Sequence, residues 1–414
     1  MKKGISRDCG IGTLVIHEGE GNNPENAHIT PIYQTSTYAF PDVATASDIG
    51  KGLQKGHIYG RYGSPNTEQA ARKIALLEGL DLIRSKPDLE VDDLVACRMF
   101  SSGMAAISSA VLGWVKAGDT LIAQKSIYGS SFTFFHEAAP RLGIKVVWVE
   151  DVSAEGWERA LGSHPEAVLV YVETPANPTM MIVDLAMVAN IAHAHDCRLM
   201  VDNTFATPYC QRPLSFGADV VVHSTTKYLS GHGVVVGGAV VSPHLDYMEE
   251  NMKLMIKVLG GAPSSFDAWL TNIGLKTFEL RMERHCKNAM ATAEFLAKHP
   301  KVEKVYYPGL AECPGHGLAR RQMQGFGGML SFELKGGFAA GETLMNHVRM
   351  ATLAVSLGNV DTLIQHPASM THRSVPREIR EQMGISDGLV RLSVGIENME
   401  DIRKDFEQGL SAIE

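Results

Sequence analysis

Residues 219–228 read Asp219-Val220-Val221-Val222-His223-Ser224-Thr225-Thr226-Lys227-Tyr228. The valine run predicts a buried strand, and the hydroxyl residues and lysine that follow it predict a polar strand end. A lysine held beside apolar residues has a lowered pKa and becomes a nucleophile toward carbonyl carbon. Ser224 and Thr226 are suited to hold a phosphate oxygen. On this segment alone, a surface lysine after a strand is the simpler interpretation.

Short apolar runs on both sides of this stretch alternate with helical patterns. Strands are expected at 94–99, 120–123, 145–149, 167–172, 198–201, 219–222 and 238–241, and helices at 103–116, 130–142 and 184–196. Strands that are apolar throughout predict a largely parallel α/β sheet covered on both faces, with ligands at the carboxyl ends of the strands. The last strand follows with little room for a crossover helix, which favours an antiparallel orientation.

The chain is predicted to have three parts. Residues 1–64 are rich in Gly, Pro, Asn, Thr and aromatic residues with weak periodicity, so we expect them to pack on the body or to reach a neighbouring subunit. Residues 65–262 form the large α/β domain. Residues 263–414 indicate a smaller α+β domain, with a helical run at 265–299, strands at 304–307, 329–334 and 389–393, and a helix at 399–413.

Composition narrows the class of protein. The chain has 414 residues, is 45% hydrophobic, and carries 38 basic against 46 acidic side chains, a net charge of −8. This balance is typical of a globular protein and argues against nucleic acid as a partner. No apolar run approaches the ~18 residues of a membrane span, and Met1-Lys2-Lys3-Gly4 leads into no secretory signal. The six cysteines fit neither a zinc site nor a disulfide framework, so we expect no metal and a cytoplasmic location.

Two further segments bear on the interpretation of Lys227. Met99-Phe100-Ser101-Ser102-Gly103-Met104 predicts a strand, a small-residue turn and a helix start, and free amides at a helix N-terminus suit phosphate. Tight packing is the alternative. Asp202 ends an apolar strand, where it would keep a protonated heteroaromatic nitrogen cationic; an Asx turn or helix cap is the alternative.

A third segment is Tyr171-Val172-Glu173-Thr174-Pro175-Ala176-Asn177-Pro178. Here a strand stops at two prolines that restrain the backbone of Asn177. Asn177 can donate to a ring hydroxyl or to a substrate carboxylate, and a rigid surface turn is the alternative. A lysine, an aspartate and a phosphate-holding helix start, all at strand ends, are the set that pyridoxal 5′-phosphate (PLP) requires.

On these motifs the chain resembles the Cys/Met-metabolism (trans-sulfuration) family of PLP-dependent enzymes over nearly its whole length. The motifs occur in the family's order and spacing: Glu173-Thr174-Pro175-Ala176-Asn177-Pro178, Val201-Asp202-Asn203-Thr204 and His223-Ser224-Thr225-Thr226-Lys227-Tyr228. The resemblance implies a fold-type I PLP-dependent transferase, with a mostly parallel seven-stranded sheet and a smaller C-terminal α+β domain.

The resemblance also implies how the cofactor is held. Lys227 would carry PLP as a Schiff base, and Asp202 would pair with the pyridinium nitrogen. The phosphate would be held by the Gly103 and Met104 amides and the Ser224 and Thr226 hydroxyls. Tyr59 and Arg61 match residues that reach a neighbouring subunit's cofactor phosphate. An obligate dimer, doubled into a homotetramer, is therefore expected.

Other matched residues concern an amino-acid substrate. Tyr128 corresponds to a tyrosine that stacks on the ring and exchanges protons with the leaving group; half-buried packing is the alternative. Arg391, inside a strand pattern, is expected to bind the substrate α-carboxylate, with an edge-strand arginine facing water as the alternative. Ser356 would lie near the Schiff-base lysine, and Asn177 near the substrate. His232 is given no role.

The implied reaction is PLP-dependent γ-elimination from a sulfur amino acid. Methionine γ-lyases are most similar at two stretches, Met282-Glu283-Arg284-His285-Cys286 and Thr362-Leu363-Ile364-Gln365-His366-Pro367-Ala368-Ser369-Met370-Thr371-His372. The chain departs from those lyases at Ser130, where they carry cysteine, near Ile256 and Lys257, where many carry Lys–Asp, and at Val234, where aspartate is frequent. An O-acetyl- or O-succinylhomoserine sulfhydrylase and a cystathionine γ-lyase are the alternatives. The intact residue set argues against a non-catalytic scaffold, and no G-x-G-x-x-G supports a dehydrogenase.

Overall fold

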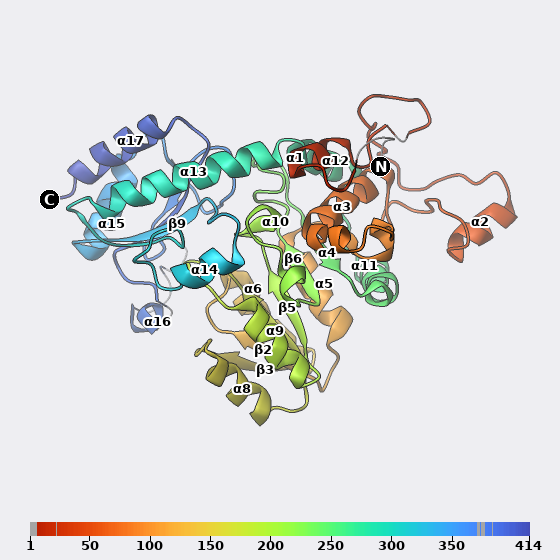
Figure 1. The fold of residues 1–414 in the computed structure, drawn as a ribbon, viewed down its shortest axis with the longest axis horizontal. Helices are drawn as coiled ribbons and strands as arrows, with labels where there is room; N and C mark the ends of the chain where they lie inside the picture. Colours follow the sequence, from red (N-terminus) through yellow and green to blue (C-terminus); the bar gives the residue numbers. More distant parts are fainter. Residues whose placement is uncertain (1–5, 22, 371–372, 374–376, 383) are drawn as a thin grey trace.

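The computed structural model describes residues 6–21, 23–370, 373, 377–382 and 384–414. The residues Met1-Lys2-Lys3-Gly4, Thr371 and His372, quoted above, lie outside the described residues. Within the described part of the chain, two sheets organise the molecule, and the long helix α13 (Phe278–Ala297) runs beside the second of them (Figure 1). The boundaries after residues 64 and 262 stay predictions.

The larger sheet has seven strands in the order β1-β7-β6-β5-β4-β2-β3. Strands β3, β2, β4, β5 and β6 are parallel, and β7 pairs antiparallel with both β6 and β1. The mostly parallel sheet and the antiparallel last strand were therefore predicted correctly. The strands are β1 (Ala96–Phe100), β2 (Thr120–Gln124), β3 (Lys145–Val149), β4 (Ala167–Glu173), β5 (Arg198–Asp202), β6 (Val220–His223) and β7 (Gly238–Ser242).

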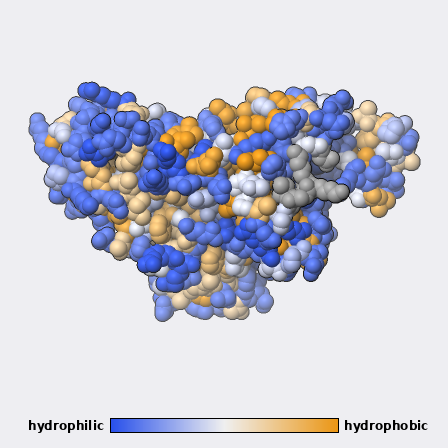
Figure 2. Space-filling view, turned by 45° about the horizontal axis from the view of Figure 1, so that its top comes forward, coloured by the Kyte–Doolittle hydropathy of each residue, from blue (hydrophilic) through white to orange (hydrophobic). Residues whose placement is uncertain are grey.

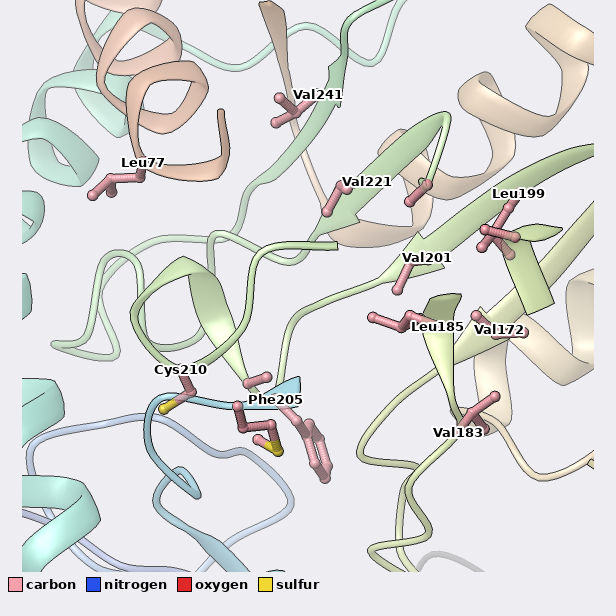
Figure 3. Packing of buried hydrophobic residues seen from close by; sticks show 14 of the residues in the cluster. Leu77, Val172, Val183, Leu185, Leu199, Val201, Phe205, Cys210, Val221 and Val241 are labelled. Carbon is pink, nitrogen blue, oxygen red and sulfur yellow. The ribbon is translucent and has the colours of Figure 1, made fainter. Parts of the chain in front are cut away.

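Both faces of this sheet are buried, which explains its unbroken apolar strands. On one face, Val172, Val201, Val221 and Val241 are register partners across β4 to β7 and pack into one core cluster (Figure 3). The sequence neighbours of these valines point to the opposite face of the sheet. They belong to a second core cluster, which includes Tyr171, Met200 and Val222. The carboxyl ends of the strands thus rest on a rigid base.

Helices cover this sheet. Helix α3 begins at a capping box formed by Ser64 and Thr67, with Pro65 at its first position. The helices of this region are α3 (Pro65–Glu78), α4 (Leu80–Ser85), α5 (Gly103–Trp114), α8 (Ala154–Ser163), α9 (Leu185–Ala194), α10 (Thr207–Cys210) and α11 (Lys253–Leu259).

The single helix expected over 130–142 is wrong. The segment consists of α6 (Gly129–Thr133), a π-helical turn (Phe134–Ala138) and α7 (Ala139–Arg141). Pro140 lacks the N–H that an α-helix would direct to the carbonyl of His136, so a regular ladder cannot continue through it.

The second sheet has five strands in the order β10-β11-β12-β9-β8. Two of them were missed by the sequence analysis because they span only two and three residues, too few to show an alternating pattern. The strands are β8 (Val302–Tyr306), β9 (Met329–Leu334), β10 (Thr352–Leu353), β11 (Leu363–Gln365) and β12 (Leu389–Ser393). They are accompanied by α14 (His316–Gln322), α15 (Gly337–His347), α16 (Arg377–Gln382) and α17 (Met399–Ser411).

The long helical run expected over 265–299 is two helices, α12 (Ser265–Leu275) and α13. Between them, the Gly274 carbonyl accepts hydrogen bonds from the Thr277 hydroxyl and from the guanidinium of Arg281. Side chains that capture a carbonyl at this point end the backbone ladder of the first helix.

Residues 31–63, which we call the arm, differ from the rest of the chain. They contain α2 (Val43–Gly50), which projects from the body beyond the other helices (Figure 1), while α1 (Ile11–His17) lies on the body. No residue of the arm is buried, and Val43 is 86% exposed. The space-filling view shows apolar surface on this projection and along the adjoining body (Figure 2).

No helix among the residues described has the length and apolar character needed to cross a membrane.

Candidate active site

The site lies where β4, β5 and β6 end. Glu173 and Asp202 are the last residues of β4 and β5 and are register partners, and β6 ends at His223, directly before Ser224. Because these strands are parallel, their carboxyl ends meet at one edge of the sheet. Lys227 follows β6 in the turn that Ser224 begins.

Lys227 is oriented inward, contrary to a plain surface lysine. Its Nζ donates to the hydroxyl of Ser356 at 2.9 Å. Burial, together with the positive charge of Arg391, lowers the pKa of Lys227 to about 8. A neutral amine is therefore accessible near neutral pH, as attack on a carbonyl requires.

Asp202 is a buried carboxylate with few partners. Its Oδ1 accepts the Thr204 amide at 3.0 Å, and its Oδ2 accepts the Tyr171 hydroxyl at 3.3 Å. Burial raises the pKa of Asp202 above its ordinary value, although the bonds from Thr204 oppose this. A cation beside the carboxylate would relieve the desolvation of its charged form.

The start of α5 approaches the turn after β6 closely. Gly103 is its first helical residue, and a Cβ built there would lie 2.8 Å from the Cβ of Ser224. Only glycine allows the two backbones this spacing. The Gly103 and Met104 amides and the Ser224 hydroxyl thus lie near one another, and the helix start favours an anion.

Thr226, predicted to bind phosphate, uses its hydroxyl within the chain. The hydroxyl donates to the Gly237 carbonyl at 3.2 Å and accepts the Gly237 amide at 2.9 Å. It must release the carbonyl before it can donate to a phosphate oxygen.

Arg391 lies on β12 in the second sheet, so the expectation of an arginine inside a strand is confirmed. Its Nη1 donates to Asn177 Oδ1 at 3.1 Å and its Nη2 to the Ser356 carbonyl at 3.0 Å. Burial lowers the pKa of Arg391 to about 10. No ion pair joins Arg391 to a carboxylate among the described residues, so a substrate carboxylate would supply the missing charge.

Tyr128 directly precedes α6. Its backbone amide donates to Glu173 Oε2 at 2.8 Å, while its side chain is 45% exposed. The ring therefore stands on the open side of the site and its backbone is anchored to the sheet edge. Ser130 follows within the first turn of α6 and is exposed.

The arm residues stand apart from this group. The guanidinium carbon of Arg61 lies 5.4 Å from the ring centres of both Tyr59 and Tyr62. The ring contacts of Tyr59 and Arg61 are thus with each other and with Tyr62, all within the arm.

Sequence reasoning missed two residues of the site, Glu173 and Tyr171. The motifs predicted no role for Glu173 or for Tyr171. Glu173 has the same signal that identified Asp202: a carboxylate that ends an apolar strand. The Tyr171 hydroxyl bond to Asp202 has no local signal, because it depends on the register of β4 and β5.

A chain of buried polar side chains supports the strand ends from beneath. His223 and Asn203 both bond to the Glu78 carboxylate, Asn203 pairs with Gln211, and Gln211 accepts from Gln322 of α14. Because every link is buried, the network holds the residues next to Asp202 and Ser224 in one arrangement.

These residues fit PLP. A half-buried lysine with a lowered pKa, a buried carboxylate with no ion pair among the described residues and a glycine-closed helix start match its aldehyde, pyridinium nitrogen and phosphate, respectively. Within the described part of the chain, no group of three His, Cys, Asp or Glu side chains is arranged to hold a metal ion.

Comparison with known proteins agrees with this chemistry. The profile of the Cys/Met metabolism PLP-dependent enzymes matches residues 12–411. L-methionine gamma-lyases are similar: that of Porphyromonas gingivalis is 47% identical over 100% of both chains, and that of Fusobacterium nucleatum subsp. nucleatum is 48% identical over 98% of this chain and 99% of its own. The crystal structure of cystathionine gamma synthase from Xanthomonas oryzae pv. oryzae in complex with cystathionine has a TM-score of 0.89 and 38% identity, covering 98% of both chains. The chain belongs to the Cys/Met metabolism family of PLP-dependent enzymes.

Proposed function

We propose that the chain is a carbon–sulfur lyase that converts L-methionine and water to methanethiol, 2-oxobutanoate and ammonia. One observation carries this proposal. The hydroxyl of Ser356 accepts a hydrogen bond from the Lys227 amine, and the backbone carbonyl of Ser356 accepts one from the Arg391 guanidinium. A substrate carboxylate bound to Arg391 would therefore bring its α-carbon to the side of the site where Lys227 lies. Similarity to proteins named L-methionine gamma-lyase supports methionine as the substrate.

When bound, PLP supplies an electron sink for the carbanion that forms at the substrate α-carbon. Lys227 removes the α-proton and returns protons to the substrate. Asp202 keeps the pyridine nitrogen cationic. The Gly103 and Met104 amides, with the Ser224 and Thr226 hydroxyls, hold the phosphate.

Recognition and departure of the substrate involve other residues. Arg391 and Asn177 bind the α-carboxylate, and Ser356 keeps the Lys227 amine beside it. Tyr128 would face the ring of the bound cofactor, and its hydroxyl would give a proton to the leaving sulfur.

The assembly is proposed as a homotetramer, a dimer of dimers in which Tyr59 and Arg61 complete the neighbour's phosphate site. The arm supports this proposal because none of its residues is buried. Apolar side chains such as Val43 and Leu53 are exposed and are not packed against the rest of this chain. The body adds exposed Val258, Leu259 and Phe266. The six free thiols support a reducing, cytoplasmic location.

Product analysis tests the function. The loaded protein is incubated with methionine, cystathionine, O-acetylhomoserine and O-succinylhomoserine, each with and without sulfide. We expect methionine to yield methanethiol and 2-oxobutanoate without added sulfide. Turnover of only the homoserine esters with sulfide would make the chain a sulfhydrylase, and turnover of only cystathionine a cystathionine γ-lyase. Cofactor binding without any turnover would indicate a scaffold.

A further inference from the structure

The carboxylate of Glu173 connects two parts of the site that the chain places far apart in sequence. Its Oε2 accepts the backbone amide of Tyr128 at 2.8 Å, and its Oε1 accepts that of Asn177 at 2.8 Å. Each oxygen therefore serves one loop. The Tyr128 loop carries the aromatic ring, and the Asn177 loop carries the oxygen that accepts from Arg391.

Glu173 is itself held from behind. It is 4% exposed, and its backbone amide donates to the side chain of Gln124 at the end of β2. Gln124 in turn donates to the Ser126 carbonyl at 2.7 Å, close before Tyr128. The Glu173 side chain is thus held in one position at the edge of the sheet. Burial and the neighbouring Asp202 raise the pKa of Glu173, and the bonds from Tyr128 and Asn177 oppose that rise. The role of Glu173 therefore rests on the geometry of its two bonds and does not require a full negative charge.

We propose that Glu173 is a positioning residue whose carboxylate sets the spacing between the Tyr128 ring and the Asn177–Arg391 pair. This rests on the proposed function of those residues. Glu173 does not touch the substrate; it fixes the two loops between which the substrate must fit. A displacement of either loop misaligns the substrate, and small misplacements reduce rates strongly.

The test is Glu173→Gln. The amide retains the shape but offers one acceptor oxygen, so its NH₂ faces the N–H of Tyr128 or Asn177 and one bond is lost. We expect KM for methionine to rise and kcat/KM to fall by about tenfold to 100-fold. The visible circular dichroism of bound cofactor should also change without substrate, because ring stacking is altered. Glu173→Asp, which keeps a carboxyl group with two oxygens on a shorter side chain, should restore part of both.

Glu166→Gln is the matched control. Glu166 directly precedes the same strand at its opposite end, and accepts from the Thr120 hydroxyl at 3.0 Å. This variant should keep wild-type kinetics and dichroism.

The outcomes separate the two proposals. If wild type releases methanethiol, a Glu173→Gln protein with wild-type KM and wild-type dichroism overturns the positioning role, even if its unfolding midpoint falls. If wild type ignores methionine, the proposed function fails. The dichroism of the loaded variants then decides the role of Glu173.

Discussion

The sheet edge and the arm carry the two groups of residues that we propose to form one site, and they are built in opposite ways. At the edge, Asp202 and Glu173 are buried on top of a core packed on both faces of the sheet. In the arm, Tyr59 and Arg61 lie in a segment without a single buried residue. The first group takes its geometry from this chain's own core, whereas the second group has no such support.

This difference separates the groups whose pKa values are shifted by burial from the groups that remain in solvent. The groups that need lowered or raised pKa values, Lys227 and Asp202, are those that the chain desolvates itself. The arm presents solvated groups, a guanidinium and two phenol rings, and in the proposed assembly these groups act on a neighbouring subunit. One chain thus shifts the pKa values of both proposed catalytic groups, and completion of the anion site is proposed to need two chains.

The largest effect is expected from a substitution among the site residues at the sheet edge. Lys227→Ala should abolish the visible absorption band of bound cofactor and lower turnover by on the order of 10³-fold or more, because no other amine replaces it. Absorption spectra and methanethiol release measure this. Lys304→Ala, an exposed lysine on β8, should resemble wild type. A Lys227→Ala protein with the wild-type band would refute the assignment.

The next prediction concerns a substitution in the arm. Arg61→Ala and Lys227→Ala proteins should each be nearly inactive, yet after unfolding and refolding together they should regain about a quarter of wild-type activity. In a mixed dimer, one site combines an intact Lys227 with the partner's intact arm. Each variant refolded alone is the control. Absence of any recovery, with mixed dimers shown by mass spectrometry, would mean that Arg61 serves its own chain.

The smallest effect concerns pH. The rate at which apoprotein takes up the cofactor aldehyde should rise with pH through about 8, because the neutral amine of Lys227 is the reactive form. Arg391→Met removes a positive charge that disfavours the protonated amine, so its midpoint should move upward. The midpoint should not depend on protein concentration, since the arm plays no part in it. A wild-type midpoint near pH 10.5, the ordinary lysine value, would contradict the structure.

Much of the site was predictable because its signals are local. Asp202 ends an apolar strand, and Lys227 and Asn177 follow such strands. A strand end can be located from hydrophobic periodicity alone. The same reasoning predicted an antiparallel β7 from the short connection before it. Helix lengths were predicted less well: Pro140 and the bonds to the Gly274 carbonyl interrupt patterns that looked continuous.

By itself, the sequence determined which residues end the buried strands and which segment lacks a core, since both follow from the order of apolar and polar side chains. Only the tertiary structure decided that Ser356 joins Lys227 to Arg391, that Glu173 joins Tyr128 to Asn177, and that the Thr226 hydroxyl is taken by Gly237. These links connect separate loops and two different sheets. Their partners are chosen by packing in space, because a buried polar group must bond to whatever donor or acceptor the fold brings near it.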